Sequence, residues 1–137
     1  MKIVITIFMS AFLLASCKSD DHNVSSDQDV IINEALYNEI STTNYSITEA
    51  EISGDSLKVT IQSSGCDGSE WEVKLVDSGA IAESYPVQRF AKISLKNAEL
   101  CDAIVTRNYS FNLTPLQVED QLYLNLEGWE SQLHYDF

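Results

Sequence analysis

The sequence has 137 residues and a formal net charge of −13, from 21 acidic and 8 basic side chains. This length corresponds to a single domain. A surface of this charge repels nucleic acid and anionic lipid headgroups, which argues against nucleic acid as a partner.

The first 16 residues have the pattern of a signal peptide. A short positive start, Met1-Lys2, precedes residues 3–14 (IVITIFMSAFLL), an almost entirely apolar run. As a helix that rises about 1.5 Å per residue, this run spans roughly 18 Å, short of the ~30 Å hydrocarbon core of a membrane. We therefore predict a signal peptide over residues 1–16 and no permanent transmembrane helix there.

Leu14-Ala15-Ser16-Cys17 ends this run. An aliphatic residue, two small residues and a cysteine resemble the lipobox of bacterial lipoproteins. The resemblance implies cleavage before Cys17, a diacylglycerol on its thiol and usually an acyl chain on the new amino group. Two or three chains hold a protein firmly, at about 0.8 kcal/mol per buried CH2. We expect Cys17 to be the lipidated mature N-terminus; an ordinary secretory signal with an incidental cysteine is the alternative.

Residues 17–29 are expected to form the lipidated cysteine and a flexible acidic tether. They are polar and charged, so they bury too little apolar surface to offset the entropy of ordering. Lys18-Ser19-Asp20-Asp21 is similar to the acidic export tag of surface lipoproteins of Bacteroidetes. That similarity implies an outer-membrane lipoprotein exposed at the cell surface. A merely soluble tether, on a lipoprotein that faces the periplasm, is the alternative.

Residues 30–40 favour one short helix, because Ile32, Leu36 and Ile40 recur at helical spacing. From residue 45 onward the period changes to two, which is typical of half-buried strands. A phase slip between Thr48 and Ala50 indicates a bulge. Seven segments alternate in this way: 45–52, 57–62, 71–75, 91–96, 105–113, 122–126 and 133–137.

Two cysteines lie within these segments and their connections. With Cys17 lipidated, Cys66 and Cys101 remain as a pair, 35 positions apart. Export to an oxidising compartment favours their pairing, and closing such a loop contributes on the order of 3–4 kcal/mol. A redox pair or a reactive thiol is the alternative, but there is no C-x-x-C motif and no histidine near either cysteine. We predict a structural disulfide.

Together these elements predict a mainly β domain over residues 30–137. No repeated helices separate the strands, which favours an antiparallel β-sandwich of about seven strands with one short N-terminal helix and one disulfide. Residues 57–137 are also similar to small uncharacterised lipoproteins of Bacteroidetes, through Gly65-Cys66, Trp71, Cys101 and Phe111. This resemblance implies no particular activity.

Catalytic and metal-binding motifs are missing from the sequence. There is no G-x-S-x-G elbow, and the two histidines fall in the tether (His22) and on the last strand (His134). With the two cysteines paired, too few ligands remain for zinc, and no calcium-loop motif occurs. We expect no catalysis, no cofactor and no metal; an enzyme of unfamiliar type is the alternative.

Two groups of residues are candidates for other roles. Tyr123, Trp129 and Tyr135 could form an aromatic platform for sugar stacking, with core packing as the alternative. Asp55-Ser56-Leu57 resembles the short O-glycosylation acceptor of Bacteroidetes, which implies modification of Ser56.

The leading hypothesis is a membrane-anchored lipoprotein of the cell envelope that acts by binding an envelope protein or an extracellular ligand. A carbohydrate-binding accessory lipoprotein that uses the C-terminal aromatic residues is the second hypothesis.

Overall fold

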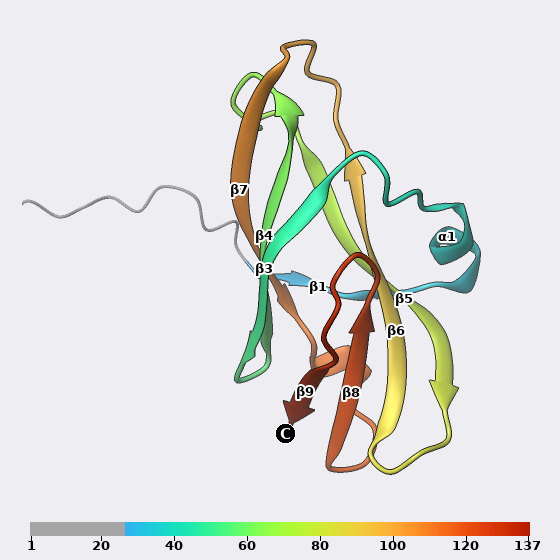
Figure 1. Cartoon of the computed structure of the whole chain (residues 1–137). Helices are drawn as coiled ribbons and strands as arrows, with labels where there is room; N and C mark the ends of the chain where they lie inside the picture. The colour runs from blue at the N-terminus through green and yellow to red at the C-terminus, as the bar shows by residue number, and fades with distance from the viewer. Residues whose placement is uncertain (1–26) are drawn as a thin grey trace, which may run out of the picture.

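The structure, a computed structural model, describes residues 27–137 as two β-sheets packed around one apolar core (Figure 1). The strand order of the first sheet is β1-β7-β4-β3, and that of the second sheet is β2-β5-β6-β8-β9. The first sheet contains β1 (Gln28–Asp29), β3 (Ser46–Ser53), β4 (Ser56–Gly65) and β7 (Ala103–Asn112). The second sheet contains β2 (Ile31–Ile32), β5 (Glu72–Ala82), β6 (Val87–Lys96), β8 (Gln121–Leu126) and β9 (Leu133–Asp136).

Alternating side chains build the core from both sheets. Leu57, Val59 and Ile61 of β4 lie in one buried cluster with Ala91 and Ile93 of β6. Burying an aliphatic side chain of this size contributes about 1.5–3 kcal/mol. The prediction of a mainly β domain with half-buried strands is therefore confirmed, and so is the bulge in β3, which falls between Ile47 and Glu49.

The prediction of a purely antiparallel sandwich was wrong, because both sheets are mixed. β1 runs parallel to β7, β2 runs parallel to β5, and β6 runs parallel to β8. The β6–β8 pair is parallel because the chain leaves the second sheet after β6, forms β7 in the first sheet, and returns to lie beside β6. A short 3-10 helix, Thr114–Leu116, lies on this return path.

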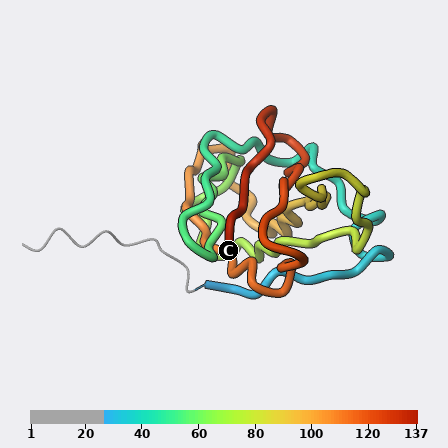
Figure 2. Tube along the Cα trace, turned by 90° about the horizontal axis from the view of Figure 1, so that it is seen from below, coloured from blue at the N-terminus to red at the C-terminus, as the bar shows by residue number. Residues whose placement is uncertain are grey.

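The N-terminal segment also differs from its prediction. Gln28 and Asp29, expected in the tether, pair with β7, and residues 31–32, expected in a helix, pair with β5. Val30 lies between the two strands and is only 5% exposed. Figure 2 shows this segment in blue, running along one side of the molecule from the first sheet toward the helix. The domain therefore includes part of the expected tether.

The one α-helix of the described residues, α1 (Glu34–Glu39), begins later than predicted. Asn33 caps it, because the Asn33 side-chain oxygen accepts a hydrogen bond from Leu36 N at 2.9 Å. The helix contacts β5, and Lys92 Nζ lies 4.4 Å from the ring centre of Tyr37. Within residues 27–137, no helix is both long enough and apolar enough to cross a membrane.

Candidate interaction site at the disulfide-bridged end

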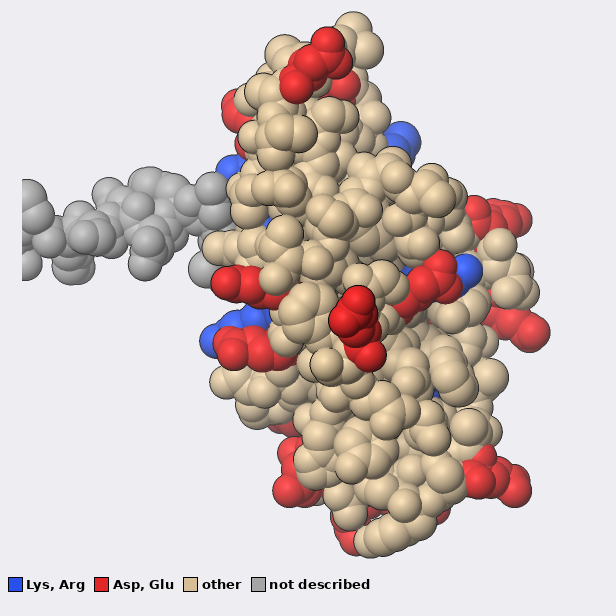
Figure 3. Space-filling view, in the orientation of Figure 1, with Lys and Arg blue, Asp and Glu red and all other residues tan. Residues whose placement is uncertain are grey.

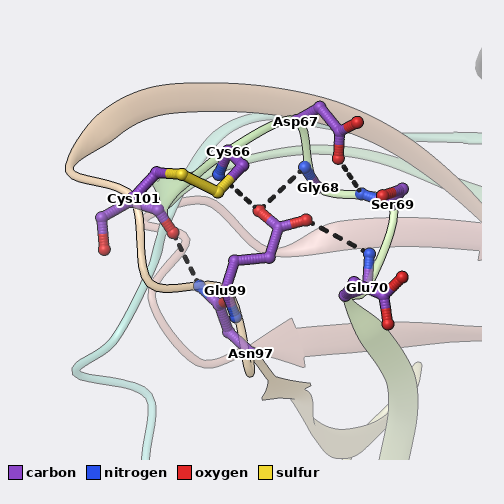
Figure 4. Close-up of a disulfide and its surroundings, with 9 residues drawn as sticks. Cys66, Asp67, Gly68, Ser69, Glu70, Asn97, Glu99 and Cys101 are labelled. Carbon is purple, nitrogen blue, oxygen red and sulfur yellow. Dashed lines mark hydrogen bonds between the residues drawn. A yellow bond between two sulfur atoms is a disulfide. The ribbon is translucent and has the colours of Figure 1, made fainter.

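Two loops cross between the sheets at the same end of the molecule. One joins β4 to β5 through residues 66–71, and the other joins β6 to β7 through residues 97–102. Both lie at the top of Figure 1. Cys66 of the first loop and Cys101 of the second form a disulfide, with Cα atoms 4.9 Å apart. The predicted disulfide is confirmed, and it joins the two crossings directly (Figure 4).

Glu99 binds the opposite loop through its carboxylate. Its Oε2 accepts hydrogen bonds from Cys66 N at 2.6 Å and from Gly68 N at 3.0 Å, and its Oε1 accepts one from Glu70 N at 3.2 Å. Partial burial raises the pKa of Glu99, but these N–H donors outweigh that effect and hold the pKa below its usual 4.5. The carboxylate is therefore a charged acceptor around which the β4–β5 loop folds (Figure 4).

Asn97 holds the Glu99 backbone in place. The Asn97 Oδ1 accepts a hydrogen bond from Glu99 N at 3.0 Å, and the Asn97 Nδ2 donates one to Ser64 O at 2.6 Å. Each loop thus bonds the other in addition to the disulfide. This network gives the end of the molecule a defined shape.

Two glycines make the close approach of the loops possible. At Gly65, a Cβ would collide with the Glu99 Oε2 and lie 3.2 Å from Trp71 Nε1. At Gly68, φ is +77° and a Cβ would come within 2.9 Å of Arg107 Cγ. The Gly-Cys-x-Gly run in the sequence is therefore explained by contacts with three distant side chains.

Two large aliphatic side chains project from this end into solvent. Leu100 is 95% exposed and Ile104 is 71% exposed. Three acidic residues of the same loops, Asp67, Glu70 and Asp102, are also exposed. Acidic side chains are visible at the upper end of the space-filling view (Figure 3). This end therefore carries exposed aliphatic and acidic side chains, together with Arg107, which lies against Gly68.

The structure separates the three aromatic residues that the sequence grouped. Tyr135 is fully buried, and its hydroxyl donates to Asp55 Oδ1 at 2.7 Å; burial and this bond raise the pKa of Tyr135 to about 12. Tyr123 lies on the opposite face of its sheet, with its ring centre 5.2 Å from that of His134. Trp129 packs against the core from the β8–β9 connection. The three rings do not share one surface.

Ser56 is half-buried at the start of β4. Its hydroxyl donates to Asp27 Oδ2 at 2.8 Å, and hydrogen bonds from Ser110 and Ser56 lower the pKa of Asp27. Cys17, the predicted lipidation site, lies outside the described residues.

The sequence analysis missed a buried ion pair in the second sheet. Arg89 Nη2 lies 2.7 Å from Asp77 Oδ1, and Arg89 Nε lies 3.2 Å from Asp77 Oδ2, with both side chains buried. The alternation of residues in the sequence could have revealed this pair. Asp77 follows Leu75 by two residues and Arg89 precedes Ala91 by two, so continuing each alternation places opposite charges on the inward face.

A shallow polar hollow of about 260 Å³ lies on the outer face of the first sheet. Its side chains come from three neighbouring strands and include two carboxylates, an ammonium group, hydroxyls and an amide. They are Glu49 and Glu51 of β3, Lys58 and Thr60 of β4, and Asn108 and Ser110 of β7. Thr60 Oγ1 already donates to Asn108 Oδ1 at 2.9 Å, so part of this set is bonded internally.

The fold and the bridged end define a disulfide-bridged β domain of two mixed sheets. No protein-family model and no curated protein matches the sequence. Similar solved structures include a protein of unknown function, DUF1344, from Bacteroides vulgatus, with a TM-score of 0.56, 17% identity and coverage of 84% of this chain and 57% of that chain. Another is a toxin-related protein from Parabacteroides distasonis, with a TM-score of 0.51, 17% identity and coverage of 81% and 59%.

This chain therefore spans less than two thirds of the length of either protein. At 17% identity, the similarity extends to the fold alone.

Proposed function

We propose that this protein is a lipid-anchored component of a bacterial cell envelope that acts by binding a partner rather than by catalysis. The observation that carries the binding role is the bridged end. A disulfide and the Glu99 carboxylate fix two loops there, while Leu100 and Ile104 stay in solvent. A site that is ordered before binding loses little conformational entropy on association. The lipobox resemblance at Cys17 supports the anchor.

Blocking signal cleavage tests the anchor. Globomycin, which inhibits lipoprotein signal cleavage, is expected to cause a precursor to accumulate in cells that make the wild-type chain. The Cys17→Ser variant should carry no lipid and should run at the precursor size with or without globomycin. A wild-type chain that matures normally in globomycin would contradict the proposed anchor.

We place the protein in the outer membrane, at the cell surface or facing the periplasm. Protease treatment of intact cells distinguishes these two orientations. Cleavage on whole cells supports a surface location and the role of Lys18 to Asp21 as an export tag. Cleavage only after the envelope is opened supports a protein that faces the periplasm.

Carbohydrate binding is a second candidate function, favoured by the polar hollow on the first sheet. Its carboxylates, hydroxyls and amide are groups that hydrogen-bond to sugar hydroxyls. A glycan array should then show a signal that Asn108→Ala abolishes. Trp129 does not line this hollow, so Trp129→Ala should leave the signal unchanged, with circular dichroism to check the fold; loss of the signal in that variant would favour the aromatic contact predicted from the sequence instead. A blank array with the wild-type protein would rule out this function.

A further inference from the structure

We propose that the bridged end docks a protein partner whose contact surface carries an apolar pocket flanked by Lys or Arg. Leu100 and Ile104 enter the pocket, and the acidic residues around them face the basic flank. The proposal rests on the binding role above and assigns to it a surface and a class of partner.

The first argument is the way Leu100 is held. Its preceding residue, Glu99, is bonded to three backbone N–H groups, and its following residue, Cys101, is covalently bridged. The backbone on both sides is fixed, so the 95% exposure of Leu100 is imposed by the fold. A large aliphatic side chain that is fixed outward has the properties of a preorganised anchor, since binding orders little that was free before.

Ile104 belongs to the same end. The register of β7 with β4 places Ile104 opposite Ser64, two residues before Cys66. Cys66 is bridged to Cys101, which follows Leu100 directly. The two exposed aliphatic residues are therefore connected through the same short stretch of fixed backbone.

Charge complementarity identifies the partner surface. Asp67, Glu70 and Asp102 are exposed in these loops and outnumber Arg107, the cation that lies against Gly68, and the whole chain carries a net charge of −13. A second copy of this chain would bring like charges together, and anionic lipid headgroups would be repelled. A surface that supplies Lys or Arg around an apolar pocket is attracted instead.

The position of the chain entry supports a protein rather than the membrane as the occupant. Asp29 pairs with Asn112 at the last residue of β7, whereas the bridged end adjoins Ala103 at its first. Ten residues of a strand extend for about 30 Å. The chain that leads to Cys17 thus enters the domain near the opposite end of β7, and the bridged end can point away from an anchored side.

Site-specific photo-crosslinking in intact cells tests the proposal with the full-length chain. A photoreactive p-benzoyl-phenylalanine replaces Leu100 or Ile104, and the matched control replaces Tyr85, which is 80% exposed in the β5–β6 connection. We expect one discrete heteromeric band from positions 100 and 104 and none from position 85. The contact peptide of the captured protein should contain Lys or Arg.

Binding of the purified pair then gives the quantitative test. Leu100→Ser should weaken binding at least about tenfold, since a truncated anchor in a pocket costs this much or more. Asp102→Lys should also weaken binding, and the loss should be larger at low salt than at high salt. Tyr85→Ser should leave binding unchanged. Circular dichroism confirms that each variant is folded.

Several results would overturn the docking proposal. These are a band at twice the chain mass, equal bands from all three positions, no band, or a contact peptide without basic residues. Binding of residues 18–137 to phosphatidylethanolamine–phosphatidylglycerol vesicles, lost in Leu100→Ser, would assign the end to the membrane instead. Failure of the lipid anchor is measured separately by the globomycin response, so the anchor and the docking surface fail independently.

Discussion

Glu99 satisfies backbone donors of a loop in the way that a capping side chain satisfies those of a helix. Its carboxylate accepts from Cys66 N, Gly68 N and Glu70 N. Hydrogen bonds to a charged acceptor are stronger than neutral ones. The ionised form is therefore the one that stabilises the bridged end, which links the stability of the fold to pH.

Glu99→Gln should lower the stability of the domain at pH 7 and have less effect in acid. The pKa of Glu99 is lower in the folded state than its usual 4.5, so its contribution is fully present above about pH 4.5. That contribution is lost as the pH falls through the folded pKa. Thermal unfolding of both proteins at several pH values should show curves that converge in acid. Glu70→Gln, which removes an equal charge from the facing β4–β5 loop, is the control; an equal effect there would contradict the role of Glu99.

The Asp77–Arg89 pair is a second residue-level determinant of stability. Asp77 Oδ1 also accepts a hydrogen bond from Gly79 N at 2.7 Å. Removing one partner of a buried pair leaves the other charge uncompensated, which costs about 3–5 kcal/mol. Asp77→Ala should therefore lower the free energy of unfolding by roughly this amount in chemical denaturation.

The double variant Asp77→Leu/Arg89→Met separates the charge effect from packing. Replacement of both charges by apolar side chains of similar size is often close to neutral. We expect the double variant to be more stable than Asp77→Ala. If it is equally destabilised or worse, the pair matters for its shape or hydrogen bonds rather than for charge balance.

At the scale of elements, the disulfide fixes the two crossings between the sheets relative to each other. Replacing both Cys66 and Cys101 by Ser should lower the free energy of unfolding by about 3–4 kcal/mol, from the entropy of the loop that the bridge closes. Denaturation of the variant checks this value. The wild-type protein in a reducing agent should show the same loss, while the reducing agent should have no effect on the variant.

The positions of the strands were predictable, because the alternation of apolar and polar residues is a local pattern. The pairing between strands was not predictable from any local pattern. Residues 57–61 and 91–95 alternate clearly, and both segments form strands with the expected side chains inward. No local pattern indicates that the chain passes from the second sheet to the first to form β7 and then returns. This excursion is what makes β6 and β8 parallel. Residues 28–29 and 31–32 are too short for a period to be visible, and Ile32 at helical spacing favoured a helix instead.

The candidate site was predictable only through its cysteines. With Cys17 assigned to the lipid, two cysteines remained, and this indicated a disulfide between residues 66 and 101. Glu99 is one of 21 acidic residues, and its role depends on backbone N–H groups about thirty positions away. The exposure of Leu100 follows from the same distant contacts, so the sequence alone gave no sign of it.

For the whole molecule, the excess of acidic residues should keep the domain monomeric. A net charge of −13 on a small chain produces self-repulsion that is strongest at low ionic strength. Analytical ultracentrifugation of residues 18–137 should show a single monomeric species at low salt over a wide range of concentrations. A dimer that forms with rising concentration at low salt would contradict this expectation.

The way the chain enters the domain has a mechanical consequence for a protein held by its N-terminus. A pull transmitted through residue 27 reaches β1 first and loads its pairing with β7. It next meets Val30, which is bonded to Asn112 O and buried in the core, and then Asn33 N, which is bonded to Asp77 O. Tension at residue 27 is thus divided between both sheets within six residues, so neither β1 nor β2 has to bear the force alone.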